Sequence, residues 1–153
     1  MSSEKPFQVA ELTSLGWPSA LVIPSRRFRL FVAADVMGVA VDVIGEFAHS
    51  ALAKGMVHFC AWGPDCERFH DIVDETVTLD EIGERRFAAP NGHDTIMTTW
   101  HDHQPLDEAL DFFVNWSLPN GGFQAGSAYW LAISVGNPEW TATIKQYLEG
   151  RLI

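Results

Sequence analysis

The chain has 153 residues, of which 20 are acidic and 10 are basic, so its formal net charge at pH 7 is -10. This balance argues against nucleic-acid binding, which needs clustered Lys and Arg side chains, and against docking on an anionic membrane surface. With 47% hydrophobic residues and a mean hydropathy of +0.02, residues 1–153 are expected to form a single globular domain.

The chain opens with a lead segment, residues 1–27, followed by a strand. Within the lead, residues 20–24 ("ALVIP") can add an edge strand that Pro24 ends. Residues 28–35 ("FRLFVAAD") form a short apolar run closed by a polar residue, which is typical of a buried strand. The lead therefore predicts at most an edge element, and the first central strand follows it.

Two helices and a strand are expected next. Apolar residues recur at helical spacing between Met37 and Leu52, and Gly55 marks the end of that helix. Residues 56–62 ("MVHFCAW") predict a second strand. Pro64 then opens a second helix, where proline is favoured at the first position.

The second half of the chain repeats the strand-helix pattern twice. After a loop over residues 83–94, residues 95–100 predict a third strand, and residues 105–118 predict a helix. Residues 128–135 predict a fourth strand, and a last helix is capped by Asn137. The acidic residues of the third helix are expected to form its solvated face: Asp107, Glu108 and Asp111.

Four strand-helix units with apolar strands predict an α/β fold. We expect a mainly parallel sheet of four to five strands with helices on both faces, a three-layer sandwich. Right-handed crossovers favour half of a flavodoxin-like sheet with the order 2-1-3-4. In this order the strand of residues 28–35 lies between the strands of residues 56–62 and 95–100.

Two turns carry a resemblance to a known family. Ala61 to Cys66 reads Ala-Trp-Gly-Pro-Asp-Cys, and Met97 to Leu106 reads Met-Thr-Thr-Trp-His before leading into Pro-Leu and an acidic helix. In both segments the chain resembles an uncharacterised bacterial domain family. The family is a domain of unknown function, so the resemblance implies no activity, only that these two turns are more than incidental.

A site is expected at the carboxyl ends of the predicted strands, where open parallel sheets bind their ligands. Three of the four strand ends carry ionisable or thiol side chains. In the order 2-1-3-4, Asp35 faces the turn from His101 to His103. The candidate crevice consists of Asp35, Trp62, Asp65, Cys66, His70, Trp100, His101, Asp102, His103 and Asn137.

The first chemical hypothesis for this crevice is a divalent metal ion. His101 and His103 are one residue apart and can present both rings to one ion, and Asp35 or Asp102 can complete the ligand set. The alternative is that both histidines are exposed turn residues and that Asp102 caps the helix after Pro105.

The second hypothesis concerns the thiols. Cys66 is expected in the first turn of its helix, where it can pair with His70 and use Asp74 as an orienting group. The alternative is a half-buried cysteine and a surface histidine. Cys60, which shares a strand face with His58, is expected to be an inert core thiol beside a neutral core histidine.

Two functions from different classes remain. The favoured one is a binding or protein-interaction module with a polar crevice, in which Trp62 and Trp100 wall a pocket for a protein partner or a small ligand; a homo-oligomer is compatible with it. The alternative is a small metal-dependent or hydrolase-like enzyme that uses Asp35, His101 and His103.

Two cysteines make no disulfide framework, and the sequence shows no secretory signal and no membrane-spanning run. We therefore expect a cytoplasmic protein without nucleic-acid or membrane partners.

Overall fold

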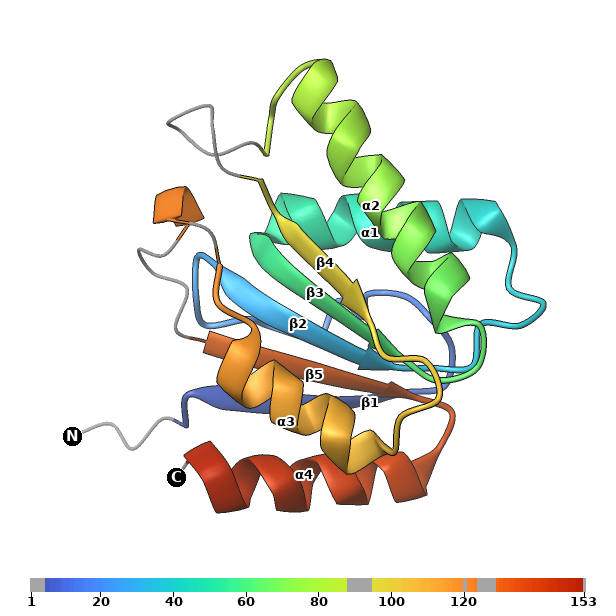
Figure 1. Cartoon of the computed structure of the whole chain (residues 1–153), viewed down its shortest axis with the longest axis vertical. Coiled ribbons are helices and arrows are strands. Elements are labelled where there is room, and N and C mark those ends of the chain that lie inside the picture. Colours follow the sequence, from blue (N-terminus) through green and yellow to red (C-terminus); the bar gives the residue numbers. More distant parts are fainter. Residues whose placement is uncertain (1–4, 88–94, 120, 124–128, 153) are drawn as a thin grey trace.

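The computed structural model describes residues 5–87, 95–119, 121–123 and 129–152. Their strands form one parallel sheet, with α1 and α2 on one face and α3 and α4 on the other (Figure 1). The elements are β1 (Phe7–Leu12), β2 (Phe28–Ala33), α1 (Val41–Lys54), β3 (Met56–Trp62), α2 (Cys66–Ile82), β4 (Met97–Trp100), α3 (Leu106–Trp116), a short 3-10 helix (Gly121–Phe123), β5 (Tyr129–Val135) and α4 (Pro138–Leu152). The predicted α/β class is confirmed.

The predicted strand order is wrong. The observed order is β1-β5-β2-β3-β4, so β3 separates β2 from β4, and β5 lies between β1 and β2. The chain steps outward from β2 to β3 to β4, with α1 and α2 as the connections, and then crosses back through α3 to β5. The switch between the two faces lies between β2 and β5, because β2 leads into α1 and β5 leads into α4.

The predicted edge strand at residues 20–24 is also wrong. The Leu21 N–H donates to the Pro18 carbonyl at 3.0 Å, so the chain turns where an extended segment was expected. The additional strand is β1, which pairs in parallel with β5 from Phe7 opposite Trp130 to Leu12 opposite Val135. The lead segment thus supplies an edge strand earlier in the chain than predicted.

The first helix starts later than its apolar spacing predicts. It begins at Val41, and Met37 lies in the preceding turn with its side chain exposed. Of the expected loop over residues 83–94, residues 88–94 lie outside the described residues. Met37 and Val41, two apolar positions of the predicted helix, are exposed and do not belong to the core.

The core consists of two layers that the sheet separates. Along β2, Leu30 and Val32 pack among residues of α1 and α2, and Phe31 and Ala33 pack among residues of α3 and α4. All four of these side chains are fully buried. Burial of one large apolar side chain contributes about 1.5–3 kcal/mol, so alternation along one strand stabilises both layers.

Glycine at the end of β3 is required by a close backbone approach. Gly63 has a φ of 120°, and a Cβ atom at this position would lie 2.2 Å from the Ala34 carbonyl oxygen. The Ala34 N–H donates to the Trp62 carbonyl at 3.0 Å, which holds the two strand ends together. A side chain at Gly63 would therefore strain the backbone and push these strand ends apart.

Replacing Gly63 with alanine should lower the free energy of unfolding by at least about 2 kcal/mol, because it combines strained backbone with a clash against a carbonyl. Urea denaturation followed by circular dichroism measures the effect. Gly150→Ala in α4 is the matched control, because a Cβ there meets no atom within 4 Å. It should leave stability unchanged or raise it by up to about 1 kcal/mol. Equal losses in the two variants would contradict the role of the close approach.

Candidate functional site

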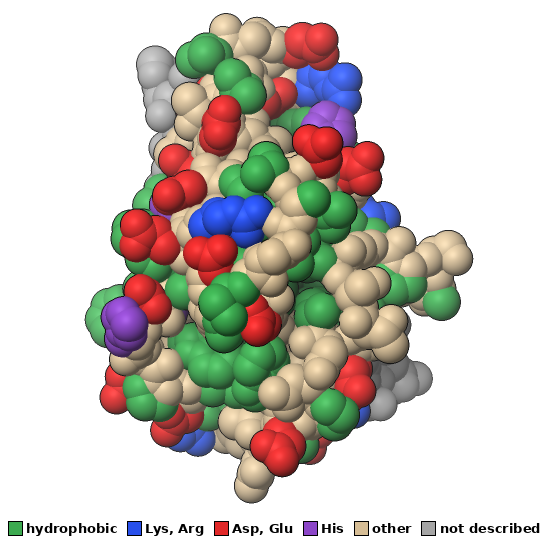
Figure 2. Space-filling view, turned by 90° about the vertical axis from the view of Figure 1, so that its right-hand side faces the viewer, with side chains coloured by type: hydrophobic (Ala, Val, Ile, Leu, Met, Phe, Trp, Pro, Cys, Tyr) green, Lys and Arg blue, Asp and Glu red, His purple; other side chains and the backbone are tan. Residues whose placement is uncertain are grey.

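The carboxyl ends of the strands lie on the face of the molecule that Figure 2 shows. Acidic side chains are spread over this face, and apolar side chains gather in its lower half (Figure 2).

At the switch point between β2 and β5, the Asp35 carboxylate accepts the Met37 N–H at 2.9 Å. The Asn137 side-chain oxygen caps α4 by accepting the N–H groups of Glu139 at 3.0 Å and Trp140 at 3.2 Å, as predicted. Both candidate side chains thus shape the turns that leave β2 and β5.

The turn after β3 places Cys66 at the first position of α2, two residues nearer the helix start than expected. Asp65 precedes it with a φ of 64° and pairs with Arg68 at 3.3 Å. The Cys66 N–H donates to the Gly63 carbonyl at 3.1 Å, and its side chain is buried. Burial raises the pKa of the Cys66 thiol, so the neutral form is favoured over a reactive thiolate.

The predicted Cys66–His70 dyad does not form. Nδ1 of His70 lies 2.9 Å from an Asp71 carboxylate oxygen, and Nε2 lies 3.0 Å from the Thr98 hydroxyl. This carboxylate–imidazole–hydroxyl series has the order of a nucleophile relay. However, the Thr98 hydroxyl donates to Asp74 at 2.9 Å, and Asp71 is exposed. The hydroxyl proton is thus directed at a carboxylate and not at the His70 imidazole.

His101, directly after β4, is buried, so the alternative of an exposed turn residue does not hold for it. Its Nε2 lies 3.0 Å from the Thr99 hydroxyl, its Nδ1 lies 3.1 Å from the side-chain oxygen of Gln104, and its ring contacts Phe112 at a centroid distance of 4.7 Å. Burial lowers the pKa of His101, and the Gln104 hydrogen bond partly offsets this effect. The neutral ring that donates from Nδ1 to Gln104 presents Nε2 as an acceptor to the Thr99 hydroxyl, which also has the Phe59 carbonyl as an acceptor at 3.4 Å.

The structure does not bring the proposed metal ligands together. His103 is 92% exposed and pairs with Asp102 at 3.2 Å, so its ring points away from the buried His101 ring. Asp35 follows β2, which is not adjacent to β4. Within residues 5–87, 95–119, 121–123 and 129–152, no group of three or more His, Cys, Asp or Glu side chains is placed to hold a metal ion. The expected convergence depended on the wrong strand order.

Trp62 and Trp100 lie on opposite faces of the sheet, so they do not wall one pocket. Ala61 is the register partner of Trp100, which places Trp62 beside His101 instead. The Trp62 Nε1–H donates to the Gln104 carbonyl at 2.8 Å, and its ring packs edge-on against Trp140. The Trp100 ring lies 4.4 Å from the His70 ring on the α2 side.

The described surface has a cleft of about 510 Å³ on the His101 side of the sheet, between α3 and α4. Its wall combines carboxylates, aromatic rings and one guanidinium group. The lining residues are His101, Gln104, Asp107, Glu108, Asp111, Phe112, Trp116, Tyr147 and Arg151. Tyr147 donates to the Asp111 carboxylate at 3.2 Å, and the Arg151 guanidinium lies over the Tyr147 ring at 4.8 Å. Sequence analysis assigned the acidic residues to a solvated face and missed the cleft.

Beneath this cleft lies a neutral histidine beside an inert thiol, as predicted. His58 is buried, with Nδ1 3.7 Å from the Cys60 sulfur and its ring facing Phe112. Burial lowers the pKa of His58 to about 4, and the positive charge of Arg29 acts in the same direction. Burial also raises the pKa of Cys60 to about 12. Neither group is poised for chemistry near neutral pH.

Comparison with known families gives a match over most of the chain. The family described as "Domain of unknown function (DUF7684)" matches residues 11–150, and the chain therefore belongs to this family. This confirms the resemblance to an uncharacterised domain family. No curated protein and no solved structure matches the chain. Among the described residues, no helix has both the length and the apolar character needed to cross a membrane.

Acid should destabilise the fold through His58. Its folded pKa of about 4 lies below the ordinary value of 6.5, so the unfolded chain binds more protons between these two pH values. The free energy of unfolding should therefore fall as the pH decreases from about 6.5 to about 4, by up to about 3 kcal/mol from this residue. Urea midpoints measured across this range should show a shallower slope in His58→Gln. An unchanged slope would contradict a neutral, buried His58.

Both cysteines should resist alkylation in the native state, because their thiols are buried and their pKa values are raised. Iodoacetamide treatment at pH 8 followed by mass spectrometry should show little modification of Cys60 or Cys66. After denaturation in guanidinium chloride, both should react. Rapid native alkylation of Cys66 would indicate a reactive thiol at the start of α2.

Proposed function

We propose that this member of the DUF7684 family is a binding module whose cleft between α3 and α4 holds an organic cation. The cation is an ammonium or guanidinium group, carried either by a small molecule or by a side chain of a protein partner. The observation behind the proposal is the composition of the cleft wall, in which three carboxylates accompany a single guanidinium group: Asp107, Glu108 and Asp111 with Arg151.

The carboxylates favour a cationic guest by direct electrostatic attraction. Asp107 and Glu108 lie in the first turn of α3 and Asp111 in the next, so a ligand along the helix can contact more than one of them. Asp111 is held in place by Tyr147 at 3.2 Å and by the Asn115 side chain at 2.9 Å. A fixed carboxylate loses little conformational freedom on binding, which supports recognition of a single charged group.

The aromatic rings of the cleft add a second attraction for a cation. Phe112, Trp116 and Tyr147 line the same space, and Trp116 is 65% exposed. The face of an aromatic ring attracts ammonium and guanidinium groups, and the effect grows when water is excluded. The Arg151 guanidinium over Tyr147 is an example of such a contact within this wall. A guest cation can use the remaining rings in the same way.

The floor of the cleft keeps the site acidic. His101 is buried, its pKa is lowered by that burial, and it contributes no positive charge near neutral pH. A protonated imidazole here would offset one carboxylate and weaken cation binding. The hydrogen bond to Gln104 at 3.1 Å fixes the ring orientation at one end of the cleft.

The binding function is better supported than the enzyme alternative, since Asp35, His101 and His103 do not converge. A reducing cytoplasm suits a chain with two free, buried cysteines. The net charge of -10 supports a basic protein or a small cation as the ligand in preference to a nucleic acid.

Calorimetric titration at low ionic strength tests the proposal with agmatine, spermidine and a short Lys/Arg peptide as cations, and with butylurea, which has no ionisable group, as an uncharged control. Binding of a cation is expected, butylurea should not bind, and added salt should weaken the interaction. Agmatine and spermidine represent free small molecules, and the peptide represents a protein side chain.

In Asp107→Asn/Glu108→Gln, the dissociation constant for the cation should rise at least about tenfold. Glu139→Gln/Glu149→Gln removes the same net charge from α4 outside the cleft lining and serves as the matched control. It should change the affinity by less than about twofold at moderate salt, because distant exposed charges are screened. Equal effects of the two double variants on the affinity would contradict a specific site, because the cation would then be attracted only by the overall negative charge of the protein.

A further inference from the structure

We propose that the groove between α1 and α2 is a docking surface for a basic amphipathic helix of a partner protein. The groove lies on the face of the sheet opposite the cation cleft, so it is a separate surface (Figure 1). Helix-in-groove recognition needs an apolar floor for the anchoring side chains and a rim that complements the charge of the partner. The α1/α2 groove has both.

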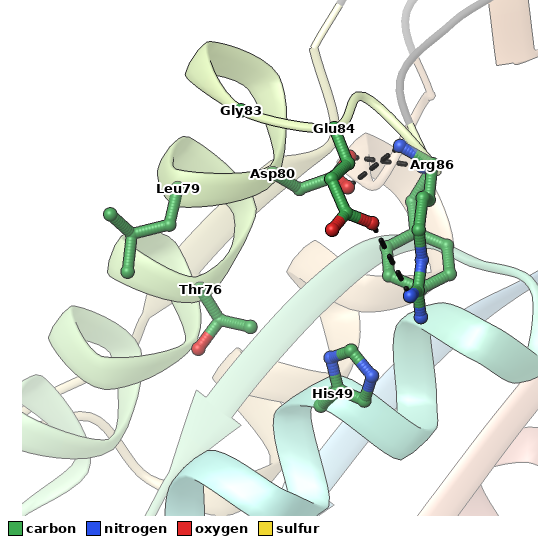
Figure 3. A pocket seen from close by; sticks show the side chains of 8 residues that line it. His49, Thr76, Leu79, Asp80, Gly83, Glu84 and Arg86 are labelled. Carbon is green, nitrogen blue, oxygen red and sulfur yellow. Dashed lines mark hydrogen bonds and ion pairs between the residues drawn. The ribbon is translucent and has the colours of Figure 1, made fainter.

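The groove is formed by two adjoining hollows of about 400 and 460 Å³. Thr76 and Leu79 of α2 line both hollows, which makes them one continuous depression. Figure 3 shows the end near Gly83, where Thr76 from α2 lies opposite His49 from α1. A ligand can therefore extend along the helices from the start of α1 to the end of α2.

Apolar side chains, most of them exposed, lie in this groove and beside it. Val41 and Leu79 line it, and each is 58% exposed. Ile72 lines the same hollow and is half-buried. Ile82, in the last turn of α2, is 77% exposed. Exposed apolar side chains that gather in one depression are typical of interaction sites, since a partner can remove them from water.

The charge of the groove determines the kind of partner. Asp42, Glu46 and Glu75 line the hollow near the start of α1, and no Lys or Arg is among the residues that line this hollow. At the other end, both Asp80 oxygens accept backbone N–H groups of the following loop, and Glu84 pairs with Arg86 (Figure 3). Negative charge is therefore concentrated at the Asp42 end, and a basic partner complements it.

Gly45 supports a helical occupant in particular. It lies in the interior of α1, where glycine is less favourable than alanine, and it lines the hollow at the Asp42 end. Packing within the chain does not require glycine here, because a Cβ atom would meet nothing within 4 Å. The missing side chain leaves room for another backbone to approach α1 closely.

A designed amphipathic Leu/Lys peptide of about 18 residues, long enough to form a helix on binding, is the probe. Fluorescence anisotropy of the labelled peptide measures its affinity. A Leu/Glu peptide with the same apolar spacing and a scrambled Leu/Lys peptide are the controls. We expect the Leu/Lys helix to bind more tightly than either control and to bind more weakly as salt is added.

Gly45→Phe fills the groove and should raise the dissociation constant for the Leu/Lys helix at least about tenfold. Gly150→Phe in α4 is the matched control, since a Cβ atom there also meets nothing within 4 Å, and it should leave the affinity unchanged. Circular dichroism and urea midpoints establish that both variants fold. Gly45→Ala supplies a milder block that should retain or raise stability and weaken binding to a smaller extent.

Equal affinities of the Gly45→Phe and Gly150→Phe variants would overturn the proposal, as would equal binding of the scrambled or the Leu/Glu peptide. If Asp107→Asn/Glu108→Gln weakens binding of the Leu/Lys peptide and Gly45→Phe does not, the peptide lies in the α3/α4 cleft. That outcome would overturn the docking groove and support the cation site. Dimerisation of the chain that Gly45→Phe abolishes would assign the groove to a second copy, which also contradicts a partner helix.

Discussion

Burial of β2 on both of its faces is the constraint on which the rest of the structure depends. This strand lies in the middle of the sheet, between β5 and β3, and it alternates Leu30 and Val32 toward one helical layer with Phe31 and Ala33 toward the other. A strand with no polar face is stable only when helices cover both sides. The turns at Gly55 and Gly63 pass close to the chain before and after β2. Only glycine fits there, because a Cβ atom at either position would lie about 2 Å from a backbone carbonyl oxygen.

The same alternation along neighbouring strands distributes the chemistry between two faces. At the end of β4, the Trp100 side chain contacts His70 of α2, and the next residue, His101, turns toward α3. Residues that are adjacent in the chain therefore belong to different surfaces. The predicted crevice combined side chains from both surfaces, and the fold separates them by the thickness of the sheet.

Both proposed binding surfaces are acidic, and they lie on opposite sides of the sheet. The α3/α4 cleft pairs carboxylates with aromatic rings, which suits a single cationic group. The α1/α2 groove pairs carboxylates with aliphatic side chains and a helix-interior glycine, which suits a longer amphipathic segment. Because the surfaces share no lining residue, a basic protein can occupy the groove while a cation occupies the cleft.

Local sequence patterns determined the class of the fold, the main helices and strands, the Asn137 cap and the buried state of Cys60, because each depends on the spacing of neighbouring side chains. Tertiary structure alone decided the strand order, since the path from β4 back to β5 between β1 and β2 depends on how the layers pack. That order separated Asp35 from His101. Val41 and Ile44 both occupy apolar helical positions one turn apart, and only packing decided that Val41 is exposed and Ile44 is buried. The two clefts are likewise products of packing, because each is formed by helices that meet only in the folded chain.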